Sequence, residues 1–190
     1  MIRSNPWVIV PRPSRELRLR LFCFPYGGGS ASIFRAWPQH LPQEVEVCAI
    51  QFPGRGARLE EPPFTRLSPL VQTLSRVLRS YLNVPFAFFG HSLGAFISFE
   101  LGRQLRKEND RSPLHLFVSG QRAPQLPDLE VGSFSAMLAP VRTVGLMPAP
   151  GQDWSFGFLR WAVSRGSGAC APRSLAHSWR KTAGKMLRTR

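Results

Sequence analysis

The amino-acid sequence predicts an α/β protein with a mostly parallel sheet and helices on both faces. The main observation is that short apolar runs alternate with amphipathic segments from residue 17 to residue 119. Such alternation favours a parallel sheet with right-handed crossovers. A second observation is the run 85–89, which is apolar throughout and typical of a strand buried on both faces. Finally, a chain of 190 residues with 43% hydrophobic residues is long enough to bury one substantial core.

The first predicted strand covers residues 17–24, where leucines alternate with arginines before the run becomes fully apolar. A proline ends this strand, and the glycine-rich segment Tyr26–Ser30 follows. We expect a short helix over 32–40 and a second strand over 45–52. The glycine-rich segment is thus predicted to be the loop that leaves the first strand.

The clearest predicted helix begins near Ser68, which we expect at its N-cap, with Pro69 in the first turn. Its apolar residues repeat at helical spacing and indicate one buried face. They are Leu67, Leu70, Val71, Leu74, Val77, Leu78, Tyr81 and Leu82.

The buried strand 85–89 leads into Gly90–Gly94 and then into a second helix that is expected to end near Lys107. Turn-forming residues follow that helix, and residues 114–119 are predicted to form a further strand. The two glycines therefore flank the junction between a strand and a helix.

Composition excludes several classes of protein. No window holds 18 uninterrupted apolar residues, and prolines interrupt the N-terminal apolar run, so neither a transmembrane span nor a signal peptide is indicated. We therefore expect a cytoplasmic protein with no membrane association. Cys23, Cys48 and Cys170 are widely spaced and form no metal or redox motif, so they are expected to be reduced and buried. No metal and no other cofactor is predicted.

The formal net charge of +14 raises the possibility of an acidic partner. More than half of this excess lies in residues 131–190, which hold nine basic residues and one acidic residue. No block of five basic residues occurs, and aromatic and basic residues are not interleaved as in proteins that bind single strands. The sequence therefore argues against nucleic-acid binding.

Gly90–Gly94 matches G-x-S-x-G, the nucleophile elbow, in which a serine is held on a strained turn between a strand and a helix. Small residues at Gly90 and Gly94 allow the turn to close. The helix beginning at Leu93 directs its free amides toward an oxyanion forming near Ser92. Ser92 is therefore the candidate nucleophile and the Leu93 amide a candidate oxyanion donor. The alternative is a serine with a purely structural role.

Acyl transfer at such a serine needs a second oxyanion donor, normally from a loop that follows an earlier strand. The segment Tyr26–Ser30 provides such a loop, and its consecutive glycines allow backbone amides to approach a substrate closely. Gly27 is the candidate donor. The alternative is an ordinary glycine-rich turn, since the segment lacks the G-x-G-x-x-G pattern of dinucleotide binding.

Four motifs occur in an order that resembles the type II thioesterases, an α/β-hydrolase family that serves modular peptide, polyketide and fatty-acid synthases. They are Phe24–Ala31, Phe52–Arg58 followed by Glu61 and Pro62, Pro85–Ala95, and Leu116–Gly120 followed by Ala123 and Pro124. The resemblance implies hydrolysis of acyl thioesters on the phosphopantetheine arm of an acyl or peptidyl carrier protein. It also implies that Ser92 is the nucleophile and that the amides of Gly27 and Leu93 form the oxyanion hole.

The resemblance covers residues 17–129. We accordingly expect residues 1–130 to be the N-terminal part of a hydrolase domain, and residues 131–190 to be an atypical, basic and poorly ordered segment. The family's acid and histidine would fall in this segment, but Asp153 and His177 match only their chain order. Its abrupt change of composition is typical of a frameshifted or replaced C-terminus, a hypothesis that resequencing would test. His91 is not expected to replace the histidine, because neighbouring side chains on the elbow diverge.

Three functions remain open at this point: a thioester hydrolase, a carrier-binding remnant that lacks turnover, and a small esterase with the same fold. Carrier proteins are typically acidic, so the net charge of +6 in residues 1–130 favours electrostatic docking. Arg55 and Arg58 are candidates for that contact, and the alternative is that both are solvated surface residues. Neither the acyl group nor the oligomeric state can be predicted from the sequence.

Overall fold

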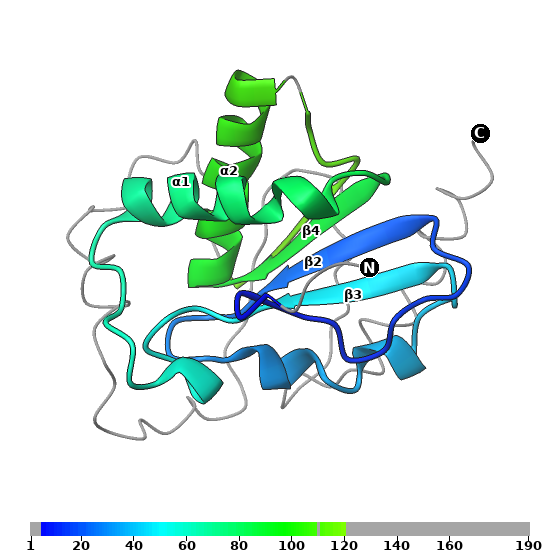
Figure 1. The fold of residues 1–190 in the computed structure, drawn as a ribbon, viewed down its shortest axis with the longest axis horizontal. Helices are drawn as coiled ribbons and strands as arrows, with labels where there is room; N and C mark the ends of the chain where they lie inside the picture. The colour runs from blue at the N-terminus through cyan, green and yellow to red at the C-terminus, as the bar shows by residue number, and fades with distance from the viewer. Residues whose placement is uncertain (1–4, 110, 121–190) are drawn as a thin grey trace.

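The computed structural model describes residues 5–109 and 111–120, which form a five-stranded sheet in the order β1-β3-β2-β4-β5 (Figure 1). The strands are β1 (Val8–Ile9), β2 (Leu19–Phe24), β3 (Val45–Ile50), β4 (Phe86–His91) and β5 (Leu116–Ser119). All neighbouring pairs are parallel except β1 and β3. The helices are α1 (Leu67–Leu78) and α2 (Leu93–Asn109), with the short 3₁₀ helices η1 (Ala31–Phe34), η2 (Trp37–Gln39), η3 (Gly56–Arg58) and η4 (Arg79–Tyr81). The predicted mostly parallel α/β sheet is confirmed.

The central strands β2 and β3 are buried along their whole length and supply side chains to a core on each face of the sheet. Phe22 and Phe24 pack in the core beneath α1 and α2, whereas Leu21 and Cys23 pack in the core beneath η1 and η2. This alternation follows from the two-residue period of a strand. The α-helices therefore cover one face of the sheet, and the 3₁₀ helices η1 and η2 cover the other (Figure 1).

Two local predictions were wrong. The segment 32–40 forms the separate 3₁₀ helices η1 and η2, because Pro38 in the first turn of η2 lacks the amide hydrogen that a continuous helix would use. Helix α1 begins at Leu67 with Arg66 at its N-cap, so Ser68 lies inside the first turn. The predicted apolar face of α1 nevertheless packs against the core, with Leu67 and Val77 half-buried. Strand β1, at the edge of the sheet beyond β3, was not predicted.

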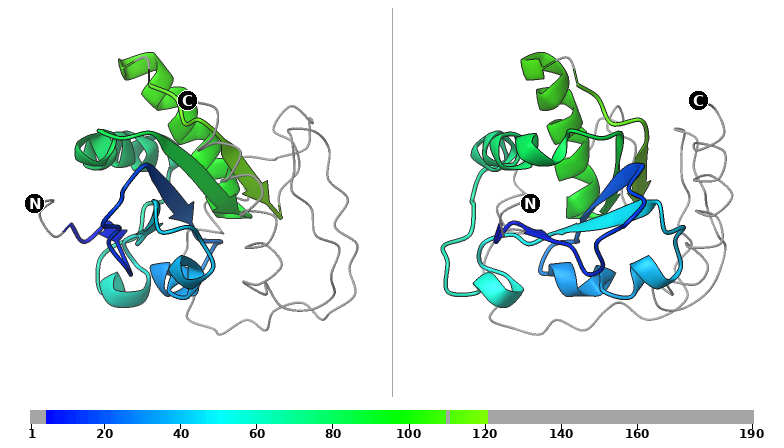
Figure 2. Two further views of the ribbon diagram at one scale, coloured as in Figure 1. Left: turned by 90° about the vertical axis from the view of Figure 1, so that its right-hand side faces the viewer. Right: turned by 45° about the vertical axis from the view of Figure 1, so that its right-hand side comes forward.

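Strand β2 lies between β3 and β4 in the sheet, whereas in the sequence it precedes both. The connections that leave β2 and β4 therefore diverge toward opposite sides of the sheet, and such switch points open a crevice at the carboxyl ends of parallel strands. Phe24 pairs with Gly90 in register. The loop after β2 and the turn after β4 consequently start side by side at the carboxyl ends of these two strands (Figure 2).

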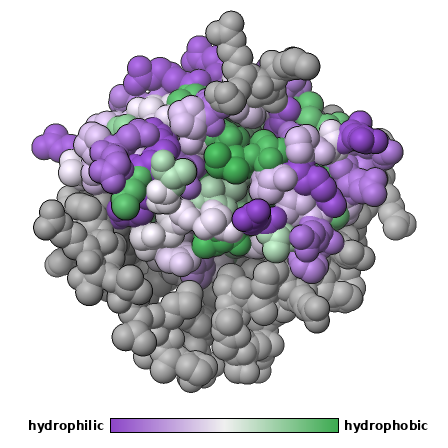
Figure 3. All heavy atoms as spheres, turned by 60° about the horizontal axis from the view of Figure 1, so that its bottom comes forward, coloured by the Kyte–Doolittle hydropathy of each residue, from purple (hydrophilic) through white to green (hydrophobic). Residues whose placement is uncertain are grey.

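The described surface is mixed in character. On the face drawn in Figure 3, a few hydrophobic groups lie among mostly hydrophilic or intermediate residues. Within residues 5–109 and 111–120, the large apolar side chains that are exposed are those of Ile9, Ile33, Leu59 and Leu114. No helix in these ranges is long and apolar enough to cross a bilayer.

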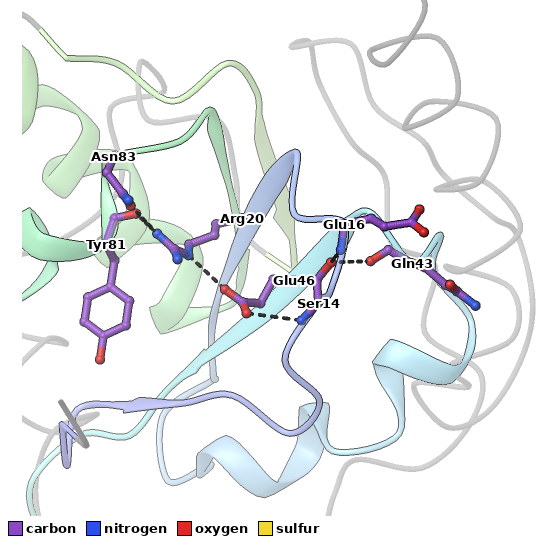
Figure 4. Close-up of polar contacts among 7 residues, drawn as sticks. All are labelled: Ser14, Glu16, Arg20, Gln43, Glu46, Tyr81 and Asn83. Carbon is purple, nitrogen blue, oxygen red and sulfur yellow. Dashed lines mark hydrogen bonds and ion pairs between the residues drawn. The ribbon is translucent and has the colours of Figure 1, made fainter. Parts of the chain in front are cut away.

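A buried ion pair joins β2 to β3 at residues that face each other across the two strands (Figure 4). Arg20 Nε donates to Glu46 Oε1 at 2.9 Å, and Arg20 Nη1 donates to the Tyr81 carbonyl at 2.6 Å and to Asn83 Oδ1 at 2.5 Å. The second carboxylate oxygen of Glu46 accepts from the Ser14 amide at 3.3 Å. Both charges are thus offset by hydrogen bonds, as burial of charged groups requires.

We expect Arg20→Met to lower the free energy of unfolding by about 3 kcal/mol, because it leaves the Glu46 carboxylate buried without its cation. Urea denaturation measures this loss. The control Arg18→Met, at an exposed position of the preceding segment, should change stability by less than about 0.5 kcal/mol. The double variant Arg20→Met/Glu46→Leu should recover part of the loss, and a double variant less stable than Arg20→Met alone would contradict this explanation.

Candidate active site

Ser92 lies between the end of β4 and the start of α2, with φ at 51°. It is the one non-glycine residue with positive φ in the described part of the chain. Left-handed backbone is unfavourable for residues with a Cβ and persists only where the surroundings impose it. Here the Ser92 amide donates to the Ser119 carbonyl at 2.7 Å, and the Ser92 carbonyl accepts from the amide of Ala95 at 2.9 Å. The backbone on both sides of the serine is thereby held.

The two glycines of the motif are required by close backbone packing. A Cβ on Gly94 would overlap the Phe24 carbonyl oxygen and lie 2.5 Å from that of Pro25. A Cβ on Gly90 would overlap the Gly94 carbonyl oxygen and lie 2.5 Å from the backbone nitrogen of Ala95. The first turn of α2 therefore rests directly on the end of β2, which brings the elbow against the start of the glycine-rich loop.

That loop begins as a tight turn in which the Gly29 amide donates to the Tyr26 carbonyl at 2.9 Å. Gly28 occupies the third position of this turn with φ at 85°, as a type II turn requires. Gly27 is the second residue of the turn. Leu93 is the first residue of α2, and the first four amides of a helix have no intrahelical acceptor. The roles of Gly27 and Leu93 as oxyanion donors stay predictions.

Gln51 connects the far end of this loop to the segment that follows β3. Its Oε1 accepts from the Ala31 amide at 3.1 Å, and its Nε2 donates to the Arg55 carbonyl at 2.6 Å. Gln51 is only 3% exposed. Sequence reasoning missed Gln51, because nothing in the local pattern shows which backbone groups a buried amide will contact.

Replacing Gln51 by leucine should lower the free energy of unfolding by about 2 kcal/mol, because the Ala31 amide and the Arg55 carbonyl lose their partner inside the protein. Hydrogen exchange should become faster at the Ala31 amide in particular. The control is Gln43→Leu, at an exposed position, which should leave both quantities nearly unchanged. Unaltered protection of Ala31 in the Gln51 variant would show that the loop is held by other contacts.

Within residues 5–109 and 111–120, no histidine is hydrogen-bonded to Ser92 Oγ. The His91 ring turns toward Ser119, with Nδ1 at 3.1 Å from its Oγ, and the expectation that His91 is not the base stays a prediction. His115 directly precedes β5, and its ring lies against that of Phe117. Burial lowers the pKa of both His91 and His115 and favours their neutral rings. Asp153 and His177, like the rest of the predicted C-terminal segment, lie outside the described residues.

The suggested docking role of Arg55 and Arg58 stays a prediction, whereas the alternative that both are solvated surface residues is wrong, because both are largely buried. Arg58 forms two hydrogen bonds with the Glu61 carboxylate, at 2.7 and 2.5 Å, and its guanidinium carbon lies 4.4 Å from the Trp7 ring centroid. Arg55 is 8% exposed and donates to the Gly54 carbonyl at 2.8 Å, and burial lowers its pKa. Both arginines hold the loop after β3 in place.

The cysteines and acidic residues of the described ranges do not form a metal site, since no group of three potential ligands occurs there. Cys23 and Cys48 are unpaired and buried, as predicted. Burial raises the pKa of both thiols and keeps them protonated. Cys170 lies outside the described residues.

The parallel sheet, the strained serine between β4 and α2 and the adjacent glycine turn together define an α/β-hydrolase fold. The family model of the thioesterase domain matches residues 19–140, and the chain belongs to this family. It is 48% identical over 123 residues to the gramicidin S biosynthesis protein GrsT of Aneurinibacillus migulanus, covering 65% of this chain and 48% of GrsT. The chain thus spans about half the length of this relative.

Solved structures agree with this assignment. RedJ, a thioesterase from the prodiginine biosynthetic pathway of Streptomyces coelicolor, is 46% identical with a TM-score of 0.55, and the match covers 58% of this chain and 41% of RedJ. BorB, a type II thioesterase from the borrelidin biosynthetic cluster, is 34% identical with a TM-score of 0.62, over 68% of this chain and 53% of BorB.

Proposed function

We propose that this chain is a serine-dependent hydrolase that releases acyl groups from the phosphopantetheine thiol of an acyl or peptidyl carrier protein. The observation that carries the proposal is the strained Ser92, held between β4 and α2 beside the glycine turn. Membership of the thioesterase family supports the thioester as the bond that is cleaved. The names of GrsT, RedJ and BorB support a place in the biosynthesis of peptides or polyketides.

The proposed reaction proceeds through an acyl-enzyme. Ser92 Oγ loses its proton to a base and attacks the thioester carbonyl, and the resulting oxyanion accepts hydrogen bonds from the amides of Gly27 and Leu93. The C–S bond then breaks and the thiolate takes up the proton as the thiol leaves. Water then gives a proton to the base and attacks the acyl-enzyme ester, the bond between the acyl carbon and Ser92 Oγ breaks, and Ser92 takes back a proton from the base as the acid leaves. None of these steps requires a metal or redox cofactor.

The base is the part of this mechanism that the described residues do not supply. Asp153 and His177 are the candidates that have the chain order of an acid and a histidine in this fold. The second candidate function, a carrier-binding remnant, would follow if no base were present. Such a chain would retain only carrier binding, because loss of the histidine from a comparable triad lowers turnover about 10⁶-fold.

A comparison of substrates distinguishes the three functions. We expect kcat/KM to be higher for an acyl thioester on a holo-carrier protein than for the oxygen ester of the same acyl group. The reverse preference would favour the small esterase. Saturable, salt-sensitive binding of the acylated carrier without release of the acid, unchanged by Ser92→Ala, would favour the carrier-binding remnant. A cytoplasmic location is part of the same proposal and stays a prediction.

A further inference from the structure

The orientation of the Gly27 amide depends on the peptide plane that it shares with Tyr26. All peptide bonds of the described residues are trans, and in a trans peptide the N–H points opposite to the carbonyl. The Tyr26 carbonyl is directed at the Gly29 amide, 2.9 Å away. The hydrogen bond to the Gly29 amide therefore sets the direction in which the Gly27 N–H points, and contacts that fix Tyr26 in this turn support that direction.

The Tyr26 ring is held on two sides. Its centroid lies 5.9 Å from that of the His91 ring, with the two planes at 89°, which is the favourable edge-to-face arrangement. A Cβ on Gly29 would lie 3.3 Å from Tyr26 Cε1, so the ring also rests closely on the turn that it belongs to. Tyr26 thus links the turn to a side chain of the elbow.

His91 is itself held in place from the third segment of the site, the end of β5. Its Nδ1 lies 3.1 Å from Ser119 Oγ. Gly120 follows with φ at 65°, and a Cβ there would lie 2.7 Å from His91 Cε1 and 3.0 Å from Nδ1. The ring therefore occupies space that only a glycine leaves open. The residue directly after His91 is Ser92, whose amide donates to the Ser119 carbonyl.

We propose that His91, itself held at the end of β5, is a positioning residue that aligns the Gly27 amide with Ser92 through its contact with the Tyr26 ring. It takes no proton from Ser92 and acts only through Tyr26. The inference rests on the proposed function for the meaning of the Gly27 amide, but the contact between His91 and the turn does not depend on turnover. It also assigns a physical role to the residue before the nucleophile, which the elbow motif itself leaves open.

A nuclear magnetic resonance experiment tests the coupling without any need for activity. Tyr26–Gly27 is the one Tyr–Gly pair in the sequence. Labelling the full chain with carbonyl-¹³C tyrosine and ¹⁵N glycine therefore gives a single carbonyl-correlated amide signal, that of Gly27. We expect His91→Ala to shift or split this signal and His91→Phe, which retains an aromatic ring, to disturb it less. A signal unchanged by His91→Ala would overturn the proposal.

Kinetics provide the second readout. His91→Ala should lower kcat for acyl-carrier hydrolysis about 10- to 100-fold with little change in KM, because misalignment of a donor affects the transition state more than binding. Since His91 acts through Tyr26, kcat of the double variant His91→Ala/Tyr26→Ala should be no lower than kcat of Tyr26→Ala alone. Additive losses, or a loss confined to KM, would contradict the proposal. A wild-type chain without turnover would refute the proposed function and leave the resonance test intact.

Discussion

Ser92→Ala is expected to lower the rate of acyl-thioester hydrolysis about 10⁶-fold, the loss found when the nucleophile of a comparable triad is removed. The oxyanion donors would survive this change, because both are backbone amides. The remaining rate should therefore still exceed that of the reaction in water by about 10³-fold. Release of free acid from an acylated carrier protein, followed by chromatography, measures both rates.

Ser98→Ala is the matched control for this variant. Ser98 lies on α2, six residues after Ser92, is buried, and donates its hydroxyl to the Ala95 carbonyl at 2.8 Å. Its loss should lower the free energy of unfolding by only about 1 kcal/mol and leave turnover nearly unchanged. If Ser92→Ala retained the activity of the Ser98 control, Ser92 would not be the nucleophile.

Gly94→Ala is expected to lower the free energy of unfolding by about 5 kcal/mol, among the largest effects of a single substitution. The added methyl group would overlap the Phe24 carbonyl oxygen and crowd that of Pro25. Backbone atoms at the end of a central strand cannot move aside as a flexible side chain does. The first turn of α2 must therefore separate from β2, which also displaces Ser92 from the glycine turn. Chemical denaturation and the rate of acid release should both record the change.

Gly102→Ala tests whether this loss comes from the contact with β2. Gly102 lies on the same helix, and a Cβ there would make only an ordinary contact with Pro113, at 3.7 Å. Alanine is the better helix former, so this variant should be about 0.5 to 1 kcal/mol more stable than the native chain. A similar loss of stability in both variants would mean that α2 tolerates no added volume, and the account of Gly94 would fail.

The parts of the fold that could be predicted are those set by local patterns. The apolar runs placed β2, β3, β4 and β5, and the glycines on either side of Ser92 placed the elbow at the junction with α2. The resemblance to the thioesterases rested on these same segments, and the family model confirms it. The segment 32–40 failed because a single proline decides between one helix and two 3₁₀ turns.

Contacts between distant segments could not be predicted. Gln51 reaches Ala31, and His91 reaches both Tyr26 and Ser119, and only the fold brings these residues together. The contacts of Arg58 could not be predicted either. Its charge suggests a docking contact, which stays a prediction, but the sequence does not show that it lies against Trp7 and Glu61, where it stabilises the loop after β3.

Labelling with a serine-directed fluorophosphonate tests the central claim most directly. The full chain should take up one equivalent of the probe, and mass spectrometry of the tryptic peptide 80–103 should locate it on Ser92 rather than on Ser80 or Ser98. Ser92→Ala should abolish the uptake, and the Gly102→Ala chain should retain it. A folded protein that takes up no probe, or that carries it on another serine, would contradict the assignment of Ser92 as an activated nucleophile.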